Sequence, residues 1–277
     1  MPRPKPDLDA LRARIAALEK RPVLAEGAGS ASRNRPGGED DLLGLLKAPA
    51  GLLHEIFADE HRQSGTALGF TLGLAGSLIT RSRQALIYLQ LAAEAQEIGL
   101  PYGLGFSAFG LTPDRLVIGR IGTVPELLWA LEEALACRAV AGVIVDLASH
   151  PKALDFTASR RIALRSAAAG TSAFLIRYGT GRQASAARLR WHVKAGASAG
   201  QPFDAGAPGN PRFNVEIEKL RLGQVRQAEQ HHLILDWTEN GFVSVDPRQH
   251  SLAPLRRPAP PPRPQPAALG HRLSQAG

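Results

Sequence analysis

The chain has 277 residues, of which 44% are hydrophobic and 21% are charged, so it is long enough for one large domain or two small ones with a buried core. Its single Cys excludes a disulfide framework and any cysteine-based zinc site, and suits a reducing cytoplasm. Half of the net charge of +8 lies in residues 253–277, so the overall basicity is weak evidence of nucleic-acid binding.

The amino-terminal residues 1–40 predict a short amphipathic helix followed by a flexible linker. The helix is expected over residues 7–20 and the Gly/Ser-rich linker over 25–40. Four apolar residues fall at helical spacing: Leu8, Leu11, Ile15 and Leu18. Because so short a helix is marginal alone, this stripe needs a partner, either its own domain or another subunit or protein.

Residues 41–252 predict one α/β core. Apolar runs predict strands at 52–57, 85–89, 115–121, 140–147 and 171–178, and the stretches between them predict helices at 65–79, 91–98, 125–137 and 154–169. Strands that alternate with helices in this way indicate right-handed crossovers and a doubly wound, mostly parallel sheet.

The pattern changes after residue 180 to strands joined by turns rich in Gly and Pro. These strands are expected at 188–195, 213–222, 231–237 and 242–245. They predict an antiparallel extension of the parallel sheet. The Pro/Arg-rich residues 253–277 are low in complexity and predict a disordered tail.

The uncharged stretch 63–80 is too short for a membrane span and contains Gly69, Gly73 and Gly76. It predicts instead a buried helix whose small residues pack closely on the sheet. No membrane contact is expected, and the amino terminus has no apolar secretory signal, so a cytoplasmic location is predicted.

The junction between the first strand and the first helix of the core is where a nucleotide-binding loop would lie. Ser64, Gly65 and Thr66 stand there, yet no Lys lies between Lys47 and Lys152 to bind the terminal phosphates. The sequence therefore predicts a degenerate nucleotide pocket without a cofactor. ATP binding by an unusual route stays open as an alternative.

Asp146 ends an apolar strand, the position from which a carboxylate holds Mg²⁺ in phosphoryl-transfer proteins. Without a Lys partner, we expect a hydrogen-bonded or helix-capping carboxylate, or a remnant of the fold. The run 102–110 is expected to be a surface loop, and Cys137 a buried residue. No metal site is predicted, because the His residues lack ligand spacing.

Basic residues gather where ligands of open α/β sheets bind, near the carboxyl end of the last parallel strand. They are Arg177, Arg182, Arg188, Arg190 and Lys194. One interpretation is a solvated basic surface. The other is a contact with the phosphate backbone of single-stranded DNA or with an acidic partner, which salt would weaken.

As a set, four phrases resemble a known family: LHEIFADE (53–60), GLTPDRLVIGR (110–120), LDFTASRRIAL (154–164) and RLRWHVKA (188–195). The order of strands and helices looks like the RecA-type core, and these phrases resemble the ImuA family of bacterial damage-inducible mutagenesis, which is also related to SulA. The resemblance covers about residues 40–245.

This resemblance implies a RecA-like fold and a non-catalytic accessory role in SOS-induced translesion DNA synthesis. The implied partners are an ImuB-type protein similar to Y-family polymerases, an error-prone replicative-type DNA polymerase and RecA, with a nucleoid location during DNA damage. The helix at 7–20 resembles the arm by which RecA protomers bind their neighbours. Gln90 stands where RecA's second strand leads into an acidic catalytic residue. Two alternatives remain, a SulA-like cell-division inhibitor and a RecA-related ATPase with an unusual phosphate loop.

Overall fold

The computed structural model describes residues 44–47, 50–201, 203–222, 225–226 and 231–245. The described residues up to Val245 belong to one compact unit. The predicted amphipathic helix with Leu8, Leu11, Ile15 and Leu18, its linker and the Pro/Arg-rich tail lie outside the described residues.

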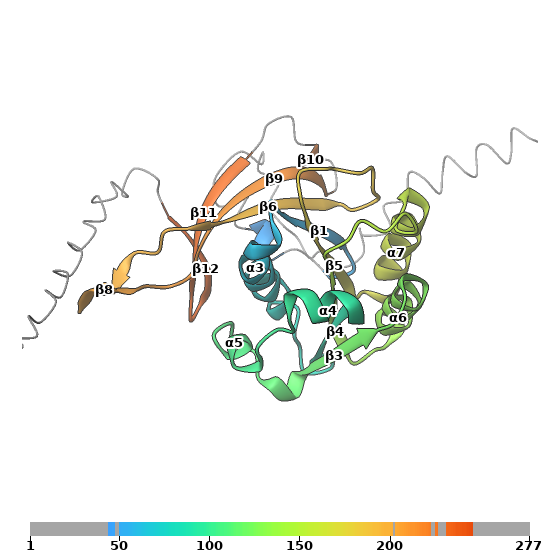
Figure 1. Ribbon diagram of the computed structural model, residues 1–277, viewed down its shortest axis with the longest axis horizontal. Helices are drawn as coiled ribbons and strands as arrows, with labels where there is room; N and C mark the ends of the chain where they lie inside the picture. Colours follow the sequence, from blue (N-terminus) through green and yellow to red (C-terminus); the bar gives the residue numbers. More distant parts are fainter. Residues whose placement is uncertain (1–43, 48–49, 202, 223–224, 227–230, 246–277) are drawn as a thin grey trace, which may run out of the picture. The chain divides into compact units, whose positions relative to one another are not determined.

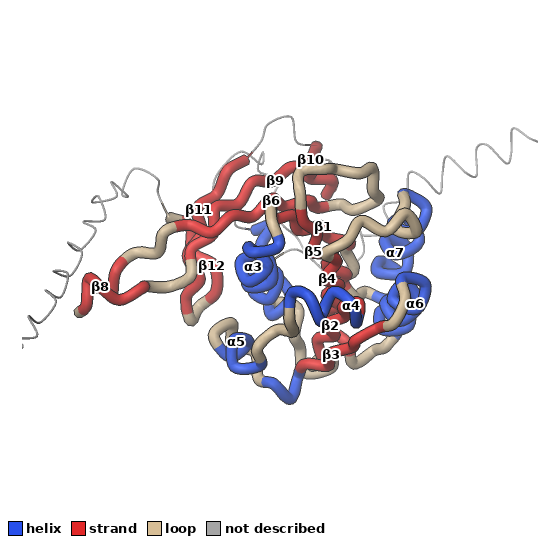
Figure 2. Tube along the Cα trace, viewed as in Figure 1, coloured by secondary structure: helices blue, strands red, loops and turns tan. Residues whose placement is uncertain are grey.

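One large mixed sheet organises this unit, with the strand order β12-β11-β9-β6-β1-β5-β4-β2-β3 (Figures 1 and 2). The strands on this path are β1 (Leu53–Ala58), β2 (Ala85–Leu91), β3 (Leu116–Ile121), β4 (Val140–Leu147), β5 (Ser172–Tyr178), β6 (Leu189–Gly196), β9 (Arg212–Leu222), β11 (His231–Thr238) and β12 (Gly241–Ser244). The short β10 (Val225–Arg226) pairs with β9, and β7 (Gly200–Gln201) pairs with β8 (Asp204–Pro208) in a separate ribbon.

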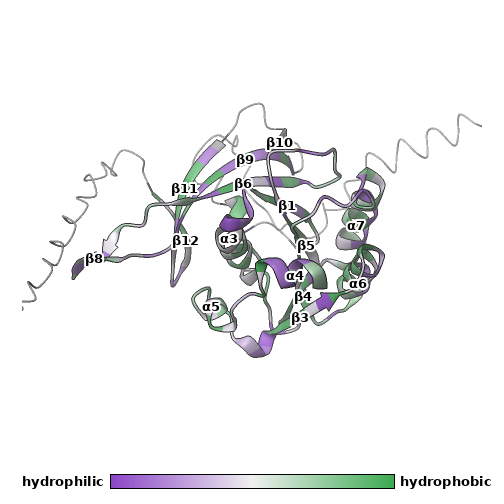
Figure 3. Cartoon of the chain, viewed as in Figure 1, coloured by the Kyte–Doolittle hydropathy of each residue, from purple (hydrophilic) through white to green (hydrophobic). Residues whose placement is uncertain are grey.

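The sheet is parallel from β3 through to β6 and antiparallel from β6 through β9 and β11 to β12. This confirms the expected RecA-like α/β sheet with an antiparallel extension. β4 has helices on both faces of the sheet and is buried at every position. β9, in the antiparallel part, alternates between buried and partly exposed residues. Figure 3 shows the same contrast as apolar colouring along β4 and mixed colouring along β9.

The helices cover both faces of the parallel strands (Figure 1). α3 packs on one face against β1, β5 and β6, and α6 and α7 pack together on the other face, α6 against β4 and β2 and α7 against β5 and β1. The helices are α3 (Ser64–Gly76), α4 (Ala92–Ile98), α5 (Gly103–Ser107), α6 (Val124–Ala136) and α7 (Phe156–Ala169), with the 3-10 turns η1 (His61–Gln63) and η2 (Pro113–Arg115).

Local sequence sets the ends of α6 and α7. Thr123 and Glu126 form a reciprocal capping box at the start of α6, which satisfies two backbone donors that have no partner within the helix. Asp155 accepts a hydrogen bond from the backbone N–H of Ala158 at the start of α7. Gly170 ends α7 in the left-handed conformation, as the sequence predicted.

The sequence predicted that the glycines of α3 pack closely on the sheet, which is confirmed at Gly73 but not at Gly69. A Cβ on Gly73 would lie 2.5 Å from the ring of Phe242, which belongs to strand β12 of the sheet. A Cβ on Gly69 would lie 2.6 Å from the ring of Phe109, in the loop after α5. The small residues therefore admit aromatic rings from the loop after α5 and from the β11–β12 hairpin, because a hairpin that extends the sheet folds back over α3.

Two further expectations were wrong. The run 102–110, expected to be a surface loop, contains α5, and its Phe106 is buried in the main hydrophobic core. Cys137, expected to be buried, is exposed because α6 ends one residue before it. Within the part of the chain that the structure describes, no helix has the length and apolar character needed to cross a membrane, and α3 is a buried helix.

The packing of α3 gives a stability prediction. Gly73→Ala is expected to lower the free energy of unfolding by about 1–2 kcal/mol, because overpacking against two rings outweighs the better helix propensity of Ala. Gly76→Ala is the matched control, since its Cβ would meet only Leu111, at 3.7 Å. Urea unfolding of both variants measures the difference, and equal stabilities would contradict the close packing at Gly73.

Candidate functional site

The region that sequence reasoning assigned to a degenerate nucleotide pocket lies at the carboxyl ends of the parallel strands. Ser64, Gly65 and Thr66 are the first residues of α3, directly after β1 and η1. η1 brings this helix start to the end of β4, since His61 Nε2 lies 3.0 Å from the carbonyl oxygen of Ala148. The structure thus brings the β1–α3 junction and the strand of Asp146 together.

Both carboxylate oxygens of Asp146 accept hydrogen bonds from buried tyrosines. Tyr88 of β2 donates to Oδ2 at 2.7 Å, and Tyr178 of β5 donates to Oδ1 at 2.9 Å. Asp146 is only 3% exposed. Because β2 and β5 flank β4 on its two sides, the carboxylate is held between neighbouring strands and not at a helix cap.

The electrostatics of this group follow from its burial. Burial raises the pKa of Asp146, and the hydrogen bonds from Tyr88 and Tyr178 oppose that rise. Burial, reinforced by the nearby Asp146 carboxylate, raises the pKa of both tyrosines. The two hydroxyls therefore stay protonated and act as donors toward Asp146.

Further side chains lie near the Asp146 carboxylate. The ring of His61 meets Tyr178 edge to face, with centroids 4.7 Å apart. The Glu94 carboxylate accepts hydrogen bonds at 2.9 Å from the backbone N–H groups of Ala148 and Ser149, which fixes the turn after β4. Gln90 lies beside Asp146 in the sheet register and is fully buried, and its side-chain amide has no hydrogen-bond partner among the described residues.

Around Asp146, the described β1–α3 junction carries no Lys, and each carboxylate oxygen accepts a tyrosine hydroxyl. A phosphate loop needs a Lys, and a Walker-B carboxylate needs a free oxygen that faces the water shell of Mg²⁺. Arg62 is the cation of the β1–α3 junction, and it is exposed and paired with Glu60. What the geometry can do is hold β2, β4, β5 and η1 together at this edge of the sheet.

Sequence reasoning missed Tyr88, Tyr178 and Glu94. Tyr88 lies within β2 and Tyr178 ends β5, and both share the strand parity of Asp146. This parity puts them on its face of the sheet if β2 and β5 flank β4. That neighbourhood depends on the strand order, which a single sequence does not provide.

The basic residues near the end of β5 are mostly bound to acids of the same chain. Arg177, expected at a surface, is 2% exposed, and its Nη1 lies 3.6 Å from Glu55 Oε1. Burial lowers the pKa of Arg177, and Glu55 opposes that change. Arg190 donates to Glu55 Oε2 through Nε at 3.0 Å and Nη2 at 2.8 Å, and Ser185 donates to the same oxygen.

The other members of this group differ in exposure. Arg182 forms a bidentate pair with Glu218 and lies over the ring of Phe57, 4.0 Å from its centroid. Lys194 is half exposed, with its Nζ 3.0 Å from Asp59 Oδ2. Arg188 is exposed. A contact with DNA or an acidic partner through these five residues stays a prediction, with Arg188 and Lys194 the accessible members.

Arginines of α7 likewise join helices. Arg161 and Arg165 both pair with Glu132 of α6, and Arg165 Nε lies 3.0 Å from Glu132 Oε2. Such partly exposed pairs contribute about 1 kcal/mol or less each. They connect the two helices that cover the same face of the sheet.

The raised pKa of Asp146 gives a pH prediction. A carboxyl group with a raised folded-state pKa stabilises the fold fully below its ordinary pKa of 3.8, and this contribution is lost as the pH rises through the folded-state pKa. Asp146→Asn cannot ionise. The stability of the unaltered protein relative to this variant is therefore expected to fall above about pH 4, by up to about 1.4 kcal/mol per pH unit. Urea unfolding across pH measures it, and a constant difference would count against a buried ionisable Asp146.

Arg190 and Arg188 make a matched pair for a second test. Arg190→Ala is expected to lower the free energy of unfolding by about 3 kcal/mol, because it removes the bidentate partner of the buried Glu55. Arg188→Ala, at an exposed position two residues away, is expected to change it by less than about 0.5 kcal/mol. Equal losses in denaturant unfolding would refute the distinction between buried and accessible arginines.

The chain has curated relatives, although no family model matches it. It is 32% identical over 216 residues to Protein ImuA of Caulobacter vibrioides strain NA1000 / CB15N. The aligned region covers 73% of this chain and 80% of that protein. The same values hold for Protein ImuA of Caulobacter vibrioides strain ATCC 19089 / CIP 103742 / CB 15. At this identity and coverage, the chain belongs to the ImuA family.

Proposed function

We propose that this chain is a non-catalytic accessory protein of damage-induced mutagenesis that supports error-prone translesion DNA synthesis. Its RecA-like core serves as a scaffold for other proteins and hydrolyses no nucleotide. In this proposal it works in the cytoplasm, at the nucleoid when DNA is damaged. Membership of the ImuA family supports the process, and the geometry around Asp146 supports the absence of catalysis.

The observation that carries the proposal is the double hydrogen bond to Asp146. A carboxylate that holds Mg²⁺ has to offer an oxygen to the water shell of the ion. Here Tyr88 and Tyr178 take one oxygen each, and His61 packs against Tyr178. Each oxygen keeps a second lone pair, but an ion that displaced either hydroxyl would leave a buried donor unpaired, at a cost of about 1–3 kcal/mol.

The loop between β5 and β6 supports the same proposal. A DNA-binding loop needs free cations for the phosphate backbone. In residues 179–188 and the strands beside them, Arg177 and Arg190 share Glu55, and Arg182 is bound to Glu218. Any single-strand affinity is therefore weak and runs through the accessible Arg188 and Lys194.

The proposed partners are those that the family resemblance implies. They are an ImuB-type protein similar to Y-family polymerases and an error-prone replicative-type DNA polymerase, with RecA as a further one. A scaffold without chemistry of its own acts through its surfaces, and this chain presents exposed apolar side chains on several of them, among them Tyr102, Leu104 and Trp129.

Complementation of damage-induced mutagenesis tests the proposal. In a strain whose own copy is deleted, the Thr66→Ala and Asp146→Asn variants are expected to restore the induced mutation frequency fully. The reason is that both residues matter for a nucleotide site, whereas a scaffold needs only the fold, and Asn at position 146 keeps an oxygen that can accept a hydrogen bond from a tyrosine hydroxyl. Thr66 stands where a working loop uses a hydroxyl to hold Mg²⁺. The frequency of drug-resistant mutants after ultraviolet irradiation is the measurement.

Two controls make this result decisive. Each variant has to reach the cellular level of the unaltered protein, so that a folding defect is not read as lost activity. Calorimetry of the purified protein with ATP and Mg²⁺ is expected to give no binding heat. Nucleotide binding abolished by Asp146→Asn, together with failed complementation, would establish the rival RecA-related ATPase. Co-purification with FtsZ in place of polymerase subunits would establish the SulA-like rival.

A further inference from the structure

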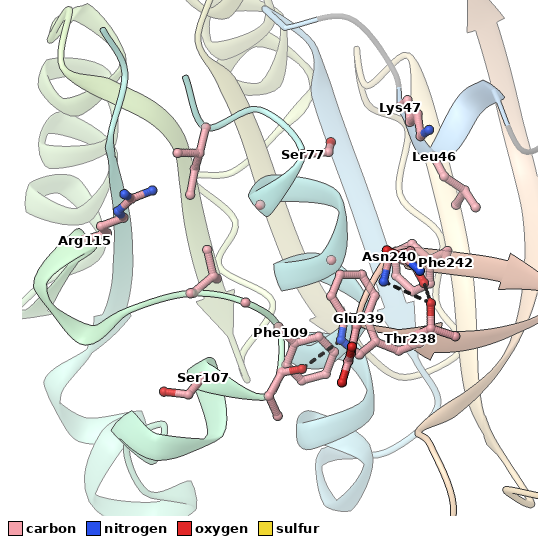
Figure 4. Close-up of a pocket in the computed structure, with 18 of the residues that line it drawn as sticks. Leu46, Lys47, Ser77, Ser107, Phe109, Arg115, Thr238, Glu239, Asn240 and Phe242 are labelled. Atoms are coloured by element: carbon pink, nitrogen blue, oxygen red, sulfur yellow. Dashed lines mark hydrogen bonds between the residues drawn. The ribbon is translucent and has the colours of Figure 1, made fainter. Parts of the chain in front are cut away.

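A groove of about 900 Å³ lies at the end of α3 opposite the nucleotide-loop region (Figure 4). Its walls come from the carboxyl-terminal half of α3, the loop after α5, the β11–β12 hairpin and the segment 44–47. Figure 4 shows Phe109 beside the hairpin residues Thr238 to Phe242, with Leu46 and Lys47 on another side. The proposed function makes no use of this groove.

The groove is preformed and mainly apolar. Trp237 Nε1 donates to the carbonyl oxygen of Ala108 at 2.8 Å and thereby joins two of the walls. The ring of Trp237 lies between those of Phe109 and Phe242, with centroid distances of 5.2 Å and 5.0 Å. At Gly76 the groove is open, since a Cβ there would meet only Leu111. Apolar grooves with one open side of this kind receive amphipathic helices.

The chain itself enters at this groove. Gly44, Leu46 and Lys47 are lining residues, and Leu46 is buried in the core. The 43 residues that precede Gly44 contain the apolar stripe of residues 7–20 that needs a partner. The charged residues of the lining, Lys47, Arg115 and Glu239, have both signs, so apolar contact and not charge selects the occupant.

We propose that residues 7–20 bind in this groove of their own chain as an amphipathic helix, with Leu8, Leu11, Ile15 and Leu18 toward Trp237, Phe109 and Gly76. A chain of 23 residues, the length of 21–43, with the linker behaviour that the sequence predicts would span about 26 Å, enough to lay a 14-residue helix of about 21 Å along the groove. Because the linker starts on the groove wall, it holds the segment there at an effective concentration in the millimolar range. That tether favours the segment's own chain over a second copy.

Disulfide trapping tests the proposal in the full-length protein. The exposed Cys137 is first replaced by Ser, and a thiol is placed on the groove wall as Gly76→Cys, a position with room for a side chain. The second thiol is Ile15→Cys on the apolar stripe or, as matched control, Ala13→Cys, which a helix of 3.6 residues per turn places on the opposite face. The two positions lie two residues apart in the sequence, so their tethers are nearly equal in length. The Ile15 pair is expected to close within one chain several-fold faster than the Ala13 pair, as read by non-reducing electrophoresis and mass spectrometry.

A second wall position protects the test against a folding defect. Ser77→Cys is nearly isosteric and lines the same groove. Equal rates for the Ile15 and Ala13 pairs, or no disulfide from Ile15 to either wall position, would overturn the proposal. Mixing Ile15→Cys protein with Gly76→Cys protein reports exchange between chains. Disulfides that form only between chains would overturn binding within one chain and identify a second copy as the occupant.

Discussion

A buried carboxylate held by two tyrosines is the constraint on which the functional edge of this molecule depends. Asp146 ends the central strand β4, and the hydroxyls of Tyr88 and Tyr178 reach it from the strands on either side. A buried charge is tolerated only where its hydrogen bonds are complete, so three strands must keep their register for this group to persist. The same bonds engage both oxygens of Asp146, which supports the proposed absence of nucleotide chemistry.

The basic residues nearby also form ion pairs with acids of the same chain. The buried Glu55 holds Arg177 and Arg190, and Glu218 holds Arg182, so charges that look like a binding surface in sequence stabilise the path of the β5–β6 loop. A buried acid that loses its cation is strongly destabilising, which ties this loop to β1 and β9. The accessible charge that remains is small. This suits a scaffold better than a protein that binds DNA along its sheet edge.

The two ends of α3 lie in different surroundings. Its amino-terminal end lies beside the closed cluster around Asp146, whereas its carboxyl-terminal half lines the open aromatic groove. Gly69 and Gly73 connect these observations, because the absence of side chains lets Phe109 and Phe242 pack directly on the helix. The helix thus supports an internal polar cluster at one end and a docking surface at the other.

The sequence by itself determined the elements and the fold class. Hydrophobic periodicity is a local signal, and for that reason the strands on the sheet path and the helices α3, α4, α6 and α7 could be predicted to within a few residues, whereas α5 was missed. The lack of a Lys between Lys47 and Lys152 is likewise a feature of the sequence alone. Only the tertiary structure decided which strands are neighbours, and therefore that tyrosines from β2 and β5 reach Asp146, that Arg177 is buried beside Glu55, and that a ring from the loop after α5 meets Gly69. Those contacts join residues far apart in the chain, and their partners depend on strand order and side-chain direction, which no local pattern encodes.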